Sequence, residues 1–474
     1  MLCQIVLRII LSVVFLNISC QAKSGAPGGP GSIVLADAYN QVGAWNRTYS
    51  LLEPQQIHLS WINDGHYSRV QFVTMEAPTT AQLKYWPTGS SGNETLIQDS
   101  QSWAFVDGGL ANRTTYYHSL NFEPLTPDSV YEYQVGTISE DNTTSEQWSE
   151  IYTVKAPSAK SDFSFLVAAD MGVANAVSMA NLQRAMDKHD FIAILGDQGY
   201  DMADFNGTKG DDYMNFVQPI YANLPVLTTT GNHESAYNFS HYKNRFSIVP
   251  YQGSGFDNPM QYSIDYKALH LISINTEVLF DGTSEEKQTA LNWLEADLTK
   301  ANQNRRLRSW IVVMGHRPLY CTPQEHTDCS QKAEFLRHGP FIDPQLNTSH
   351  FGGLEDLFLK HKVDLYLCGH RHNYERTFPV AKNQRTSTSY AEAPSYFQVI
   401  SGNSGNYEGP DAMNTSSIAD WSAFRYNGYG FTSIQVSKRT LELTHWESKI
   451  DGTRGEVKDR ILVTKSRKGF QRRE

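Results

Sequence analysis

The alternation of hydrophobic and polar positions differs between two parts of the chain. Over residues 54–153, short segments alternate apolar and polar residues between turns, most clearly at residues 56–60, 70–73 and 131–135. A period of two predicts half-buried strands, and the absence of helical periods between them predicts an antiparallel sandwich. We therefore expect an all-β domain with a structural role over residues 32–155.

Beyond a linker at residues 156–160, short apolar runs alternate with helical patterns. This alternation predicts crossover connections and a largely parallel sheet, so residues 161–466 are expected to form an α/β domain. Its clearest helix starts at a capping box, Thr283-x-x-Glu286, which is followed by leucines at helical spacing.

Five apolar runs in this second part end in turns that carry polar side chains. In chain order the turns are Asp170-Met-Gly172, Gly196-Asp-Gln-Gly-Tyr200, Gly231-Asn-His-Glu234, Gly315-His316 and Gly369-His-Arg-His372. Parallel strands end at one edge of a sheet, which is where ligands bind in α/β folds. We expect these side chains to meet at such an edge, with the glycines letting the backbone turn tightly.

The five turns supply side chains that bind metals. The candidate ligands are Asp170, Asp197, Tyr200, Asn232, His316, His370 and His372. Seven oxygen and nitrogen donors are too many for one zinc ion, which takes four, but they suit two ions that share a carboxylate. The polar residues of any one turn have an ordinary explanation, because such residues are common in turns and as buried histidines. All five turns in this order favour a metal centre.

The N-terminus predicts export. Residues 1–22 read as a cleaved signal peptide, because Arg8 is followed by an apolar run too short to span a membrane. No later run reaches that length, and the basic C-terminal tail carries no lipid-anchor signal. We expect a protein without a membrane anchor that is secreted or lysosomal.

Glycosylation sequons and cysteines agree with an oxidising compartment. The Asn-x-Ser/Thr sequons are Asn46, Asn93, Asn112, Asn142, Asn206, Asn238, Asn347 and Asn414. Cys321 and Cys329 bracket a short loop in which they can pair. Cys368 lies in an apolar run and is expected to be a buried free thiol.

The composition is that of a globular protein, with 40% hydrophobic and 19% charged residues. The formal net charge of −10 argues against nucleic acid as a partner, because phosphate backbones select basic surfaces. Small phosphorylated substrates remain possible, since a metal supplies positive charge locally.

The ordered motifs D-x-G, G-D-x-x-Y, G-N-H-E, V-x-x-H and G-H-x-H closely resemble those of the purple acid phosphatases. Larger members of that family carry a fibronectin-like domain ahead of the catalytic one, so the resemblance covers nearly the whole mature chain. It implies an N-terminal fibronectin III-like sandwich and a calcineurin-like metallophosphoesterase domain, which is a double β-sandwich flanked by helices. Tyr200 is the discriminating residue, because related dinuclear phosphoesterases lack it.

The resemblance also implies a division of the ligands between two ions. Ferric iron is expected on Asp170, Tyr200 and His372, and a divalent ion (zinc, ferrous iron or manganese) on Asn232, His316 and His370, with Asp197 as the bridge. This division matches hard oxygen donors to the trivalent ion and softer nitrogen donors to the divalent one.

The implied reaction is acid hydrolysis of phosphomonoesters by attack of a metal-bound hydroxide. Asn232 and His233 are expected at the substrate, and His233 is predicted to contact the phosphate or protonate the leaving group. A purely structural role for His233 is the alternative. Two other functions stay open: a dinuclear phosphodiesterase or nucleotide hydrolase, and an inactive exported binding glycoprotein. The sequence does not define the oligomeric state.

The sequence departs from the plant enzymes after the V-x-x-H motif. Those enzymes have two adjacent histidines there, whereas this chain has Glu325-His326. His326 is either a substrate contact or a solvated loop residue, and Glu325 leaves the substrate preference open. Glu375 and Arg376 follow the last motif and are interpreted as a surface ion pair, with a role in supporting the ligands as the alternative.

Overall fold

The computed structural model describes residues 47–62, 67–90, 94–138, 146–322, 326–339, 353–405, 407–413 and 418–466. The predicted signal segment, Glu325 and five sequons lie outside the described residues; these sequons are Asn46, Asn93, Asn142, Asn347 and Asn414. The remaining three, Asn112, Asn206 and Asn238, are exposed, as a glycosylation acceptor must be.

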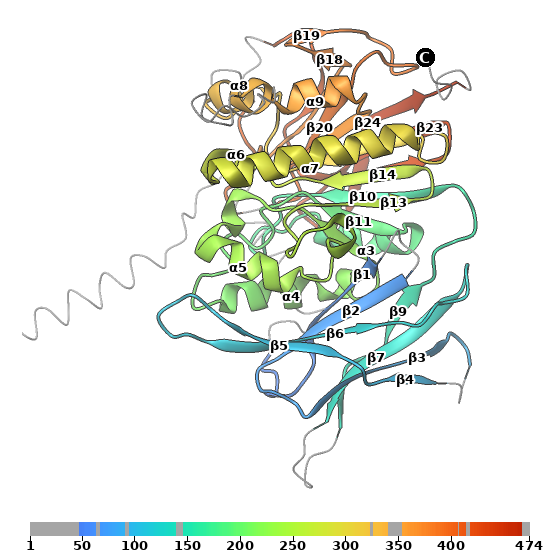
Figure 1. Cartoon of the computed structure of the whole chain (residues 1–474), viewed down its shortest axis with the longest axis vertical. Coiled ribbons are helices and arrows are strands. Elements are labelled where there is room, and N and C mark those ends of the chain that lie inside the picture. The colour runs from blue at the N-terminus through green and yellow to red at the C-terminus, as the bar shows by residue number, and fades with distance from the viewer. Residues whose placement is uncertain are drawn as a thin grey trace, which may run out of the picture.

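Two antiparallel sheets form the sandwich at the N-terminal end of the described chain, drawn in blue and cyan at the bottom of Figure 1. Its strands are β1 (Gln55–Ile62), β2 (Tyr67–Thr74), β3 (Thr80–Pro87), β4 (Thr95–Ile97), β5 (Gln101–Val106), β6 (Thr114–Asn121), β7 (Val130–Ile138), β8 (Gln147–Trp148) and β9 (Tyr152–Lys155). The strand orders are β1-β2-β6-β5 and β4-β3-β7-β8, with β9 also paired to β7. The predicted all-β sandwich is therefore confirmed.

Strand β1 differs from the half-buried strand that its alternation predicted. Seven of its eight residues are buried, polar ones included. The polar face packs against the second part of the chain: Gln56 Nε2 donates to Asp211 at 2.9 Å, and Ser60 Oγ donates to the Val226 carbonyl at 2.8 Å. Polar side chains alternate here because they make hydrogen bonds between the two parts, and water does not solvate them.

Two mixed sheets form the second part. The six-stranded sheet has the order β12-β11-β10-β22-β23-β24, and the seven-stranded sheet has the order β13-β14-β15-β16-β20-β17-β21. Their strands are β10 (Phe163–Ala168), β11 (Phe191–Ile194), β12 (Val226–Thr228), β13 (Tyr262–Tyr266), β14 (Leu269–Ser273), β15 (Trp310–Met314), β16 (Leu365–Cys368), β17 (Tyr374–Thr377), β20 (Phe397–Ser401), β21 (Ser422–Tyr426), β22 (Gly430–Val436), β23 (Thr440–Ser448) and β24 (Arg454–Thr464). A small hairpin joins β18 (Val380–Ala381) to β19 (Gln384–Arg385).

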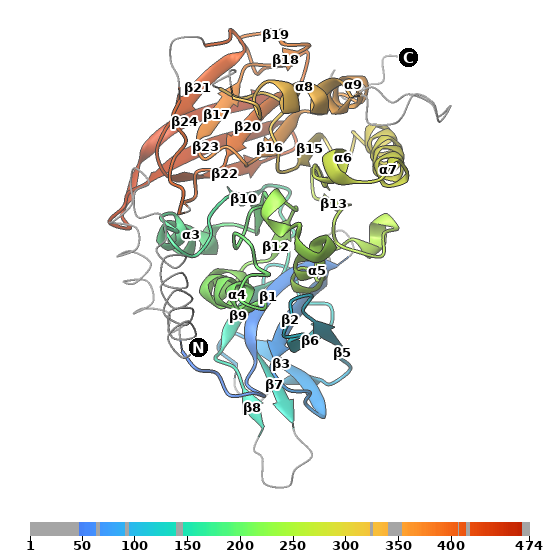
Figure 2. The ribbon, with the colours of Figure 1, turned by 90° about the vertical axis from the view of Figure 1, so that its left-hand side faces the viewer.

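The two sheets pack face to face, and helices cover their outer faces. Side chains such as Phe165 and Phe191 from one sheet and Val312 and Leu365 from the other share one core. The helices are α3 (Met179–Ala185), α4 (Thr208–Tyr221), α5 (Ala236–Arg245), α6 (Val278–Asp281), α7 (Ser284–Gln303), α8 (Gln331–His338) and α9 (Leu354–Lys360), with short 3₁₀ turns η1 (Met186–Lys188), η2 (Asn232–Glu234) and η3 (Gln252–Ser254). Figure 2 shows α3 to α5 on the side of β10 to β12, with α6 to α9 beside β15 and β16.

This architecture is the double β-sandwich flanked by helices that the family resemblance implied. The expectation of one largely parallel sheet was too simple. Only β10 to β12 and the run β14, β15, β16 and β20 pair in parallel, while the other strands of both sheets are antiparallel. The chain after β20 adds antiparallel strands to both sheets. The prediction of strands alternating with helices did not separate this all-β segment from the rest of the domain.

Local predictions about α7 and the cysteines hold. Thr283 Oγ1 accepts from the Glu286 amide while the Glu286 carboxylate accepts from the Thr283 amide, and Leu291, Leu294 and Leu298 are buried. Cys321 and Cys329 form a disulfide, and Cys368 is a buried free thiol.

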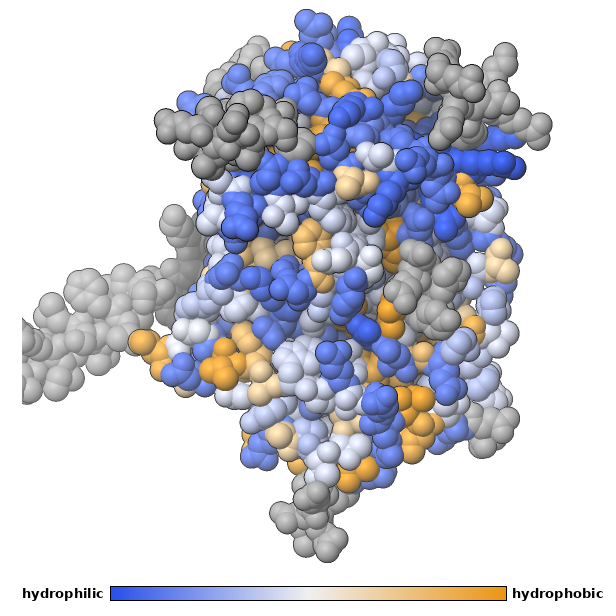
Figure 3. Space-filling model, in the orientation of Figure 1, coloured by the Kyte–Doolittle hydropathy of each residue, from blue (hydrophilic) through white to orange (hydrophobic). Residues whose placement is uncertain are grey.

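The surface in Figure 3 is mostly hydrophilic, with apolar residues in small scattered patches. None of the helices in the described ranges combines the length and the apolar character that crossing a bilayer requires.

Candidate metal centre

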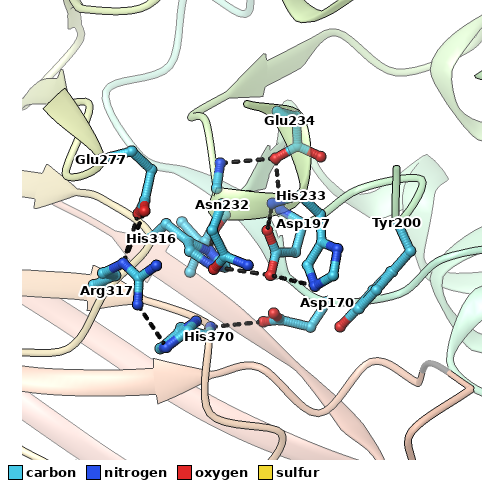
Figure 4. Close-up of polar contacts among 12 residues, drawn as sticks. Asp170, Asp197, Tyr200, Asn232, His233, Glu234, Glu277, His316, Arg317 and His370 are labelled. Carbon is cyan, nitrogen blue, oxygen red and sulfur yellow. Dashed lines mark hydrogen bonds and ion pairs between the residues drawn. The ribbon is translucent and has the colours of Figure 1, made fainter. Parts of the chain in front are cut away.

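The candidate ligands meet where strand ends of the two sheets face each other. Asp170, Asp197, Tyr200 and Asn232 follow β10, β11 and β12 of the six-stranded sheet, whereas His316, His370 and His372 follow β15 and β16 of the seven-stranded sheet. The sequence predicted one shared edge, but the site lies between edges of two sheets. Figure 4 shows the side chains of Asp170, Asp197, Tyr200, Asn232, His316 and His370 around a common space.

One group of donors surrounds His316. Its Nε2 lies 3.0 Å from Asp197 Oδ2 and 3.2 Å from Asn232 Oδ1. Its Nδ1 lies 2.8 Å from the Leu195 carbonyl and donates to it, so in a neutral imidazole the lone pair of Nε2 faces the site. Ligand atoms of Asp197, His316 and His370 all lie within 4.8 Å of one another. A single ion can contact all of them.

A second group surrounds His372. Its Nε2 lies 2.9 Å from the Tyr200 hydroxyl and 3.8 Å from Asp170 Oδ1. The two groups are joined, because the His370 amide donates to Asp170 Oδ2 at 2.9 Å. These contacts gather Asp197, Asn232, His316 and His370 in one group and Asp170, Tyr200 and His372 in the other, while the ion that each group would hold stays a prediction.

The glycines of the motifs serve two purposes, a left-handed backbone at some positions and room for a carboxylate at others. Gly172 and Gly196 have the left-handed backbone, with φ of +60° and +87°. A Cβ on Gly231, however, would lie 2.2 Å from Asp197 Oδ1, and one on Gly369 would lie 2.4 Å from Asp170 Oδ2. The expected tight turns are wrong for these two positions, because side-chain approach is what excludes a Cβ there.

The left-handed backbone falls on candidate ligands themselves. Asp170, Asp197, Tyr200 and His370 have φ values of 55°, 48°, 50° and 68°. Such conformations cost free energy for residues with a Cβ and persist where surrounding structure imposes them, which is common at functional sites.

Burial and charge suit this site to cations. Burial and the neighbouring Asp197 charge raise the pKa of Asp170, and burial with the charges of both aspartates raises the pKa of the Tyr200 phenol. Burial also opposes ionisation of Asp197, but the His316 imidazole holds its pKa well below the ordinary value. Bound cations would favour the ionised forms of all three groups, so the donor set fits metal ions.

Glu234 fixes the loops that present Asp197 and Asn232. Its buried carboxylate accepts from the amides of Asp197 and Gln198 at 2.9 Å and from that of Gly231 at 2.7 Å. Glu234 belongs to the Gly-Asn-His-Glu motif, but the motif gives no sign of this role. Its position at the end of a 3₁₀ turn, facing two strand-end loops, is a tertiary property.

His233 lies at the edge of the site. Its amide donates to Asp197 Oδ1 at 3.0 Å, its Nδ1 lies 3.0 Å from Asp201 Oδ1, and its ring lies 4.6 Å from the Tyr200 ring. Burial disfavours the charged imidazole, but the Asp201 hydrogen bond and the Asp197 charge outweigh it and raise the pKa of His233 to about 9. The protonated ring at acid pH is a proton donor.

Arg317 and Glu277 are site residues that sequence analysis missed. Arg317 Nη1 lies 3.0 Å from His370 Nε2, and its Nε donates to both oxygens of Glu277 at 2.8 and 3.0 Å. With Nε2 of His370 occupied by this contact, Nδ1 is the nitrogen left for an ion. A signal was present: the apolar run at residues 268–274 ends in Asn275-Thr-Glu277, a sixth strand end of the same kind.

The loop after β20 also reaches the centre. Asp411 Oδ2 accepts from the His372 amide at 2.8 Å, Glu408 Oε2 lies 3.7 Å from His372 Nδ1, and the Tyr407 ring lies 5.5 Å from the Tyr200 ring. Tyr407 is 44% exposed and so borders the mouth of the site. No motif marks this loop, and only folding brings it to the centre.

His326 lies beside the centre and contacts its supports. Its ring nitrogens are 3.2 and 3.3 Å from Arg371 Nη1, and Nδ1 is 3.4 Å from Asp328 Oδ2. The same Asp328 oxygen lies 3.3 Å from His370 Nε2. The His326 side chain is 45% exposed. His326 is thus accessible to solvent and contacts Asp328, which in turn contacts the candidate ligand His370.

The interpretation of Glu375 and Arg376 as a surface ion pair is wrong. Glu375 is buried in β17 and accepts from the Thr322 amide at 2.8 Å, while Arg376 pairs with Asp459 Oδ2 at 2.5 Å. The two side chains leave opposite faces of their strand, so they take different partners inside the sheet.

Comparison with known proteins follows the same division of the chain. Residues 163–374 match the family model of calcineurin-like phosphoesterases, the class of enzyme that this fold and cluster define. Residues 54–156 match the model of the purple acid phosphatase N-terminal domain, and residues 395–460 match that of the iron/zinc purple acid phosphatase-like protein C. The chain belongs to the purple acid phosphatases, a family of enzymes that hydrolyse phosphomonoesters.

Relatives cover nearly the whole chain. It is 34% identical to mouse acid phosphatase type 7, over 88% of this chain and 92% of that protein. It is 27% identical to onion phosphoenolpyruvate phosphatase, over 86% and 81%. A purple acid phosphatase from yellow lupin seeds superposes with a TM-score of 0.71 at 20% identity, covering 88% of this chain and 76% of that one, which shows a shared fold.

Proposed function

We propose that this chain is an exported acid phosphatase that hydrolyses small phosphomonoesters with ferric iron and a divalent ion, zinc, ferrous iron or manganese. The observation that carries the proposal is that seven donors, five of them buried, gather in two groups that the hydrogen bond from the His370 amide to Asp170 joins. When bound, the ions would supply positive charge to the phosphate and activate water for attack. The ferric ion would take Asp170, Tyr200 and His372, the divalent ion Asn232, His316 and His370, and Asp197 would bridge them.

The chain's own residues orient these donors. The Leu195 carbonyl sets the tautomer of His316, Arg317 and Asp328 hold Nε2 of His370, and Glu234 ties Asp197 to the Asn232 loop. Such fixed outer contacts keep ligands in place before substrate arrives, which lowers the reorganisation needed during reaction. Asn232 and the backbone around it would also border the phosphate.

His233 is proposed to donate the proton to the leaving oxygen. Its Nδ1 is held by Asp201, so Nε2 is the nitrogen available to a substrate. Replacing it (His233→Ala) should lower kcat by about 10²- to 10⁴-fold while metal content stays unchanged. Metal analysis beside single-turnover kinetics checks this, and parallel loss of metal would assign His233 a structural role.

A visible spectrum tests the ferric site. Iron bound by the Tyr200 phenolate should give the purified protein a broad charge-transfer band that disappears in Tyr200→Phe. A colourless protein that holds two metals other than iron and still cleaves phosphomonoesters would refute the ferric assignment. Greater kcat/KM on an aryl phosphodiester than on the matching monoester would instead favour the diesterase alternative.

Export rests on observations other than the centre. The predicted signal segment, the sequons and the Cys321–Cys329 disulfide all fit an oxidising compartment.

A further inference from the structure

A groove outside the candidate metal centre lies on the outer face of the six-stranded sheet. It has a volume of about 650 Å³ and runs between α3 with its following turn η1 and strands β22 to β24, elements that lie side by side in Figure 2. Ser433 and Gln435 from β22 and Thr444 from β23 line its floor, beside the apolar side chains of Phe431 and Trp446. The hydroxyl and amide groups on this part of the sheet can make hydrogen bonds to a ligand.

Cations line the walls of this groove. Arg184 and Lys188 come from the α3 side, and Arg454 and Arg460 come from β24. One carboxylate, Glu442, also lines the groove, and it pairs with Arg460. Four cations against one carboxylate contrast with the formal net charge of −10 for the whole chain. The groove is therefore a local positive site on an acidic protein.

Two of these arginines are held in place. Arg184 Nη1 donates to the Gly452 carbonyl at 2.5 Å, which ties α3 to the turn between β23 and β24. The Arg454 guanidinium lies 4.4 Å from the centre of the Trp446 ring, whose Nε1 bonds to Ser433 Oγ at 3.2 Å. Arginines fixed in this way lose less conformational entropy when they bind a ligand than freely moving surface cations do.

We propose that this groove binds a linear polyanion, a chain that repeats sulfate or phosphate groups. The argument is one of charge: Arg184 and Lys188 on one wall and Arg454 on the other line the same groove, so anionic groups of one chain can contact cations on both walls. A sulfated polysaccharide and inorganic polyphosphate share this chemistry. The inference is independent of the proposed catalysis, because the groove shares no residue with the metal centre.

Binding is measured by fluorescence anisotropy with two labelled probes, a heparin oligosaccharide and a polyphosphate chain, over a series of salt concentrations. Excess orthophosphate is present throughout to occupy the catalytic centre. The double variant Arg184→Glu/Arg454→Glu should weaken binding at least about tenfold at low salt and reduce the slope of log Kd against log salt by about two. The matched control Arg306→Glu/Arg385→Glu changes net charge equally at exposed arginines outside the groove and should change Kd less than about twofold.

Each result decides the inference. Binding of either probe that the groove variant alone loses supports it, and the probe with the lower Kd identifies the sulfate or the phosphate chain. Equal weakening by the groove variant and the control would show a diffuse charge effect and overturn it. Failure of both probes to bind the unmodified protein at low salt would overturn it as well. Unchanged hydrolysis of a small aryl phosphate confirms that the variants are folded, and that activity also tests the catalytic proposal separately.

Discussion

A methyl group added at Gly231 gives a sharp test of how the metal centre is built. Gly231 has φ of −119° and ψ of −175°, a backbone conformation that alanine adopts without strain. The added Cβ of Gly231→Ala would lie 2.2 Å from Asp197 Oδ1 and 2.6 Å from the Asp197 amide nitrogen. Any effect of this substitution therefore arises from contact with Asp197 and not from the backbone of residue 231.

The size of the effect follows from that distance. A carbon and an oxygen in contact need about 3.3 Å, so the Asp197 carboxylate must retreat by roughly 1 Å. The strand-end loop cannot absorb this shift easily, because Glu234 holds the amides of both Asp197 and Gly231. Misplacing a reacting group by 1 Å costs on the order of 10²-fold in rate, or about 2.7 kcal/mol of activation free energy. We expect kcat to fall by at least that factor, with partial loss of bound metal.

The assay is kcat on an aryl phosphomonoester together with metal content per chain. Gly89→Ala is the matched control, since Gly89 has φ of +79° and no atom within 4 Å of an added Cβ. That control should cost about 1 kcal/mol of stability through its backbone and leave kcat unchanged. Wild-type kcat and metal content in Gly231→Ala would refute the reasoning that Asp197 and Gly231 are packed at contact distance.

Two further predictions concern stability. Burial opposes protonation of His270, but hydrogen bonds at 2.7 Å to Asp265 and 2.8 Å to Asp297 outweigh it and raise its pKa to about 9. A pKa that is raised in the folded state contributes stability that is complete below about pH 6.5 and is lost as the pH rises through 9. Over that window the wild type should lose about 3 kcal/mol of stability. His270→Gln should therefore flatten the pH dependence of the unfolding midpoint there. At the interface between the two parts, Asp211→Asn should cost about 3–5 kcal/mol in denaturant unfolding, because the buried Arg245 guanidinium lies 3.0 Å from that carboxylate. A loss under 1 kcal/mol would show that water or another group solvates Arg245.

Much of the fold could be predicted because its signals are local. The period of two before residue 156, the capping box at Thr283 and the short apolar runs report how each segment meets the core, so strands and α7 were placed correctly. The alternation in β1 misled for the same reason: a local period shows that two faces differ, but not that the polar face is covered by α4.

The candidate site was predicted in part. The seven donors stand in motifs at strand ends, and the structure brings all of them together. Glu277, Arg317 and Tyr407 were missed, since Glu277 lies 40 positions from Arg317 in sequence and Tyr407 belongs to a loop without a motif. Glu375 and Arg376 were predicted on the surface because charged residues are usually exposed, whereas the strand that carries them is buried.

The sequence alone thus determined which residue types follow which apolar runs, and that order was enough to identify the family. Only the tertiary structure decided that the runs belong to two sheets whose edges meet, and that Gly231 and Gly369 are small because carboxylates lie against them. It also decided that cations from α3 and from β24 line one groove. The physical reason is separation along the sequence. Residue periodicity reflects the burial of a single segment, whereas close approach and charge clustering depend on segments up to about 270 positions apart, as at the Arg184 contact with Gly452.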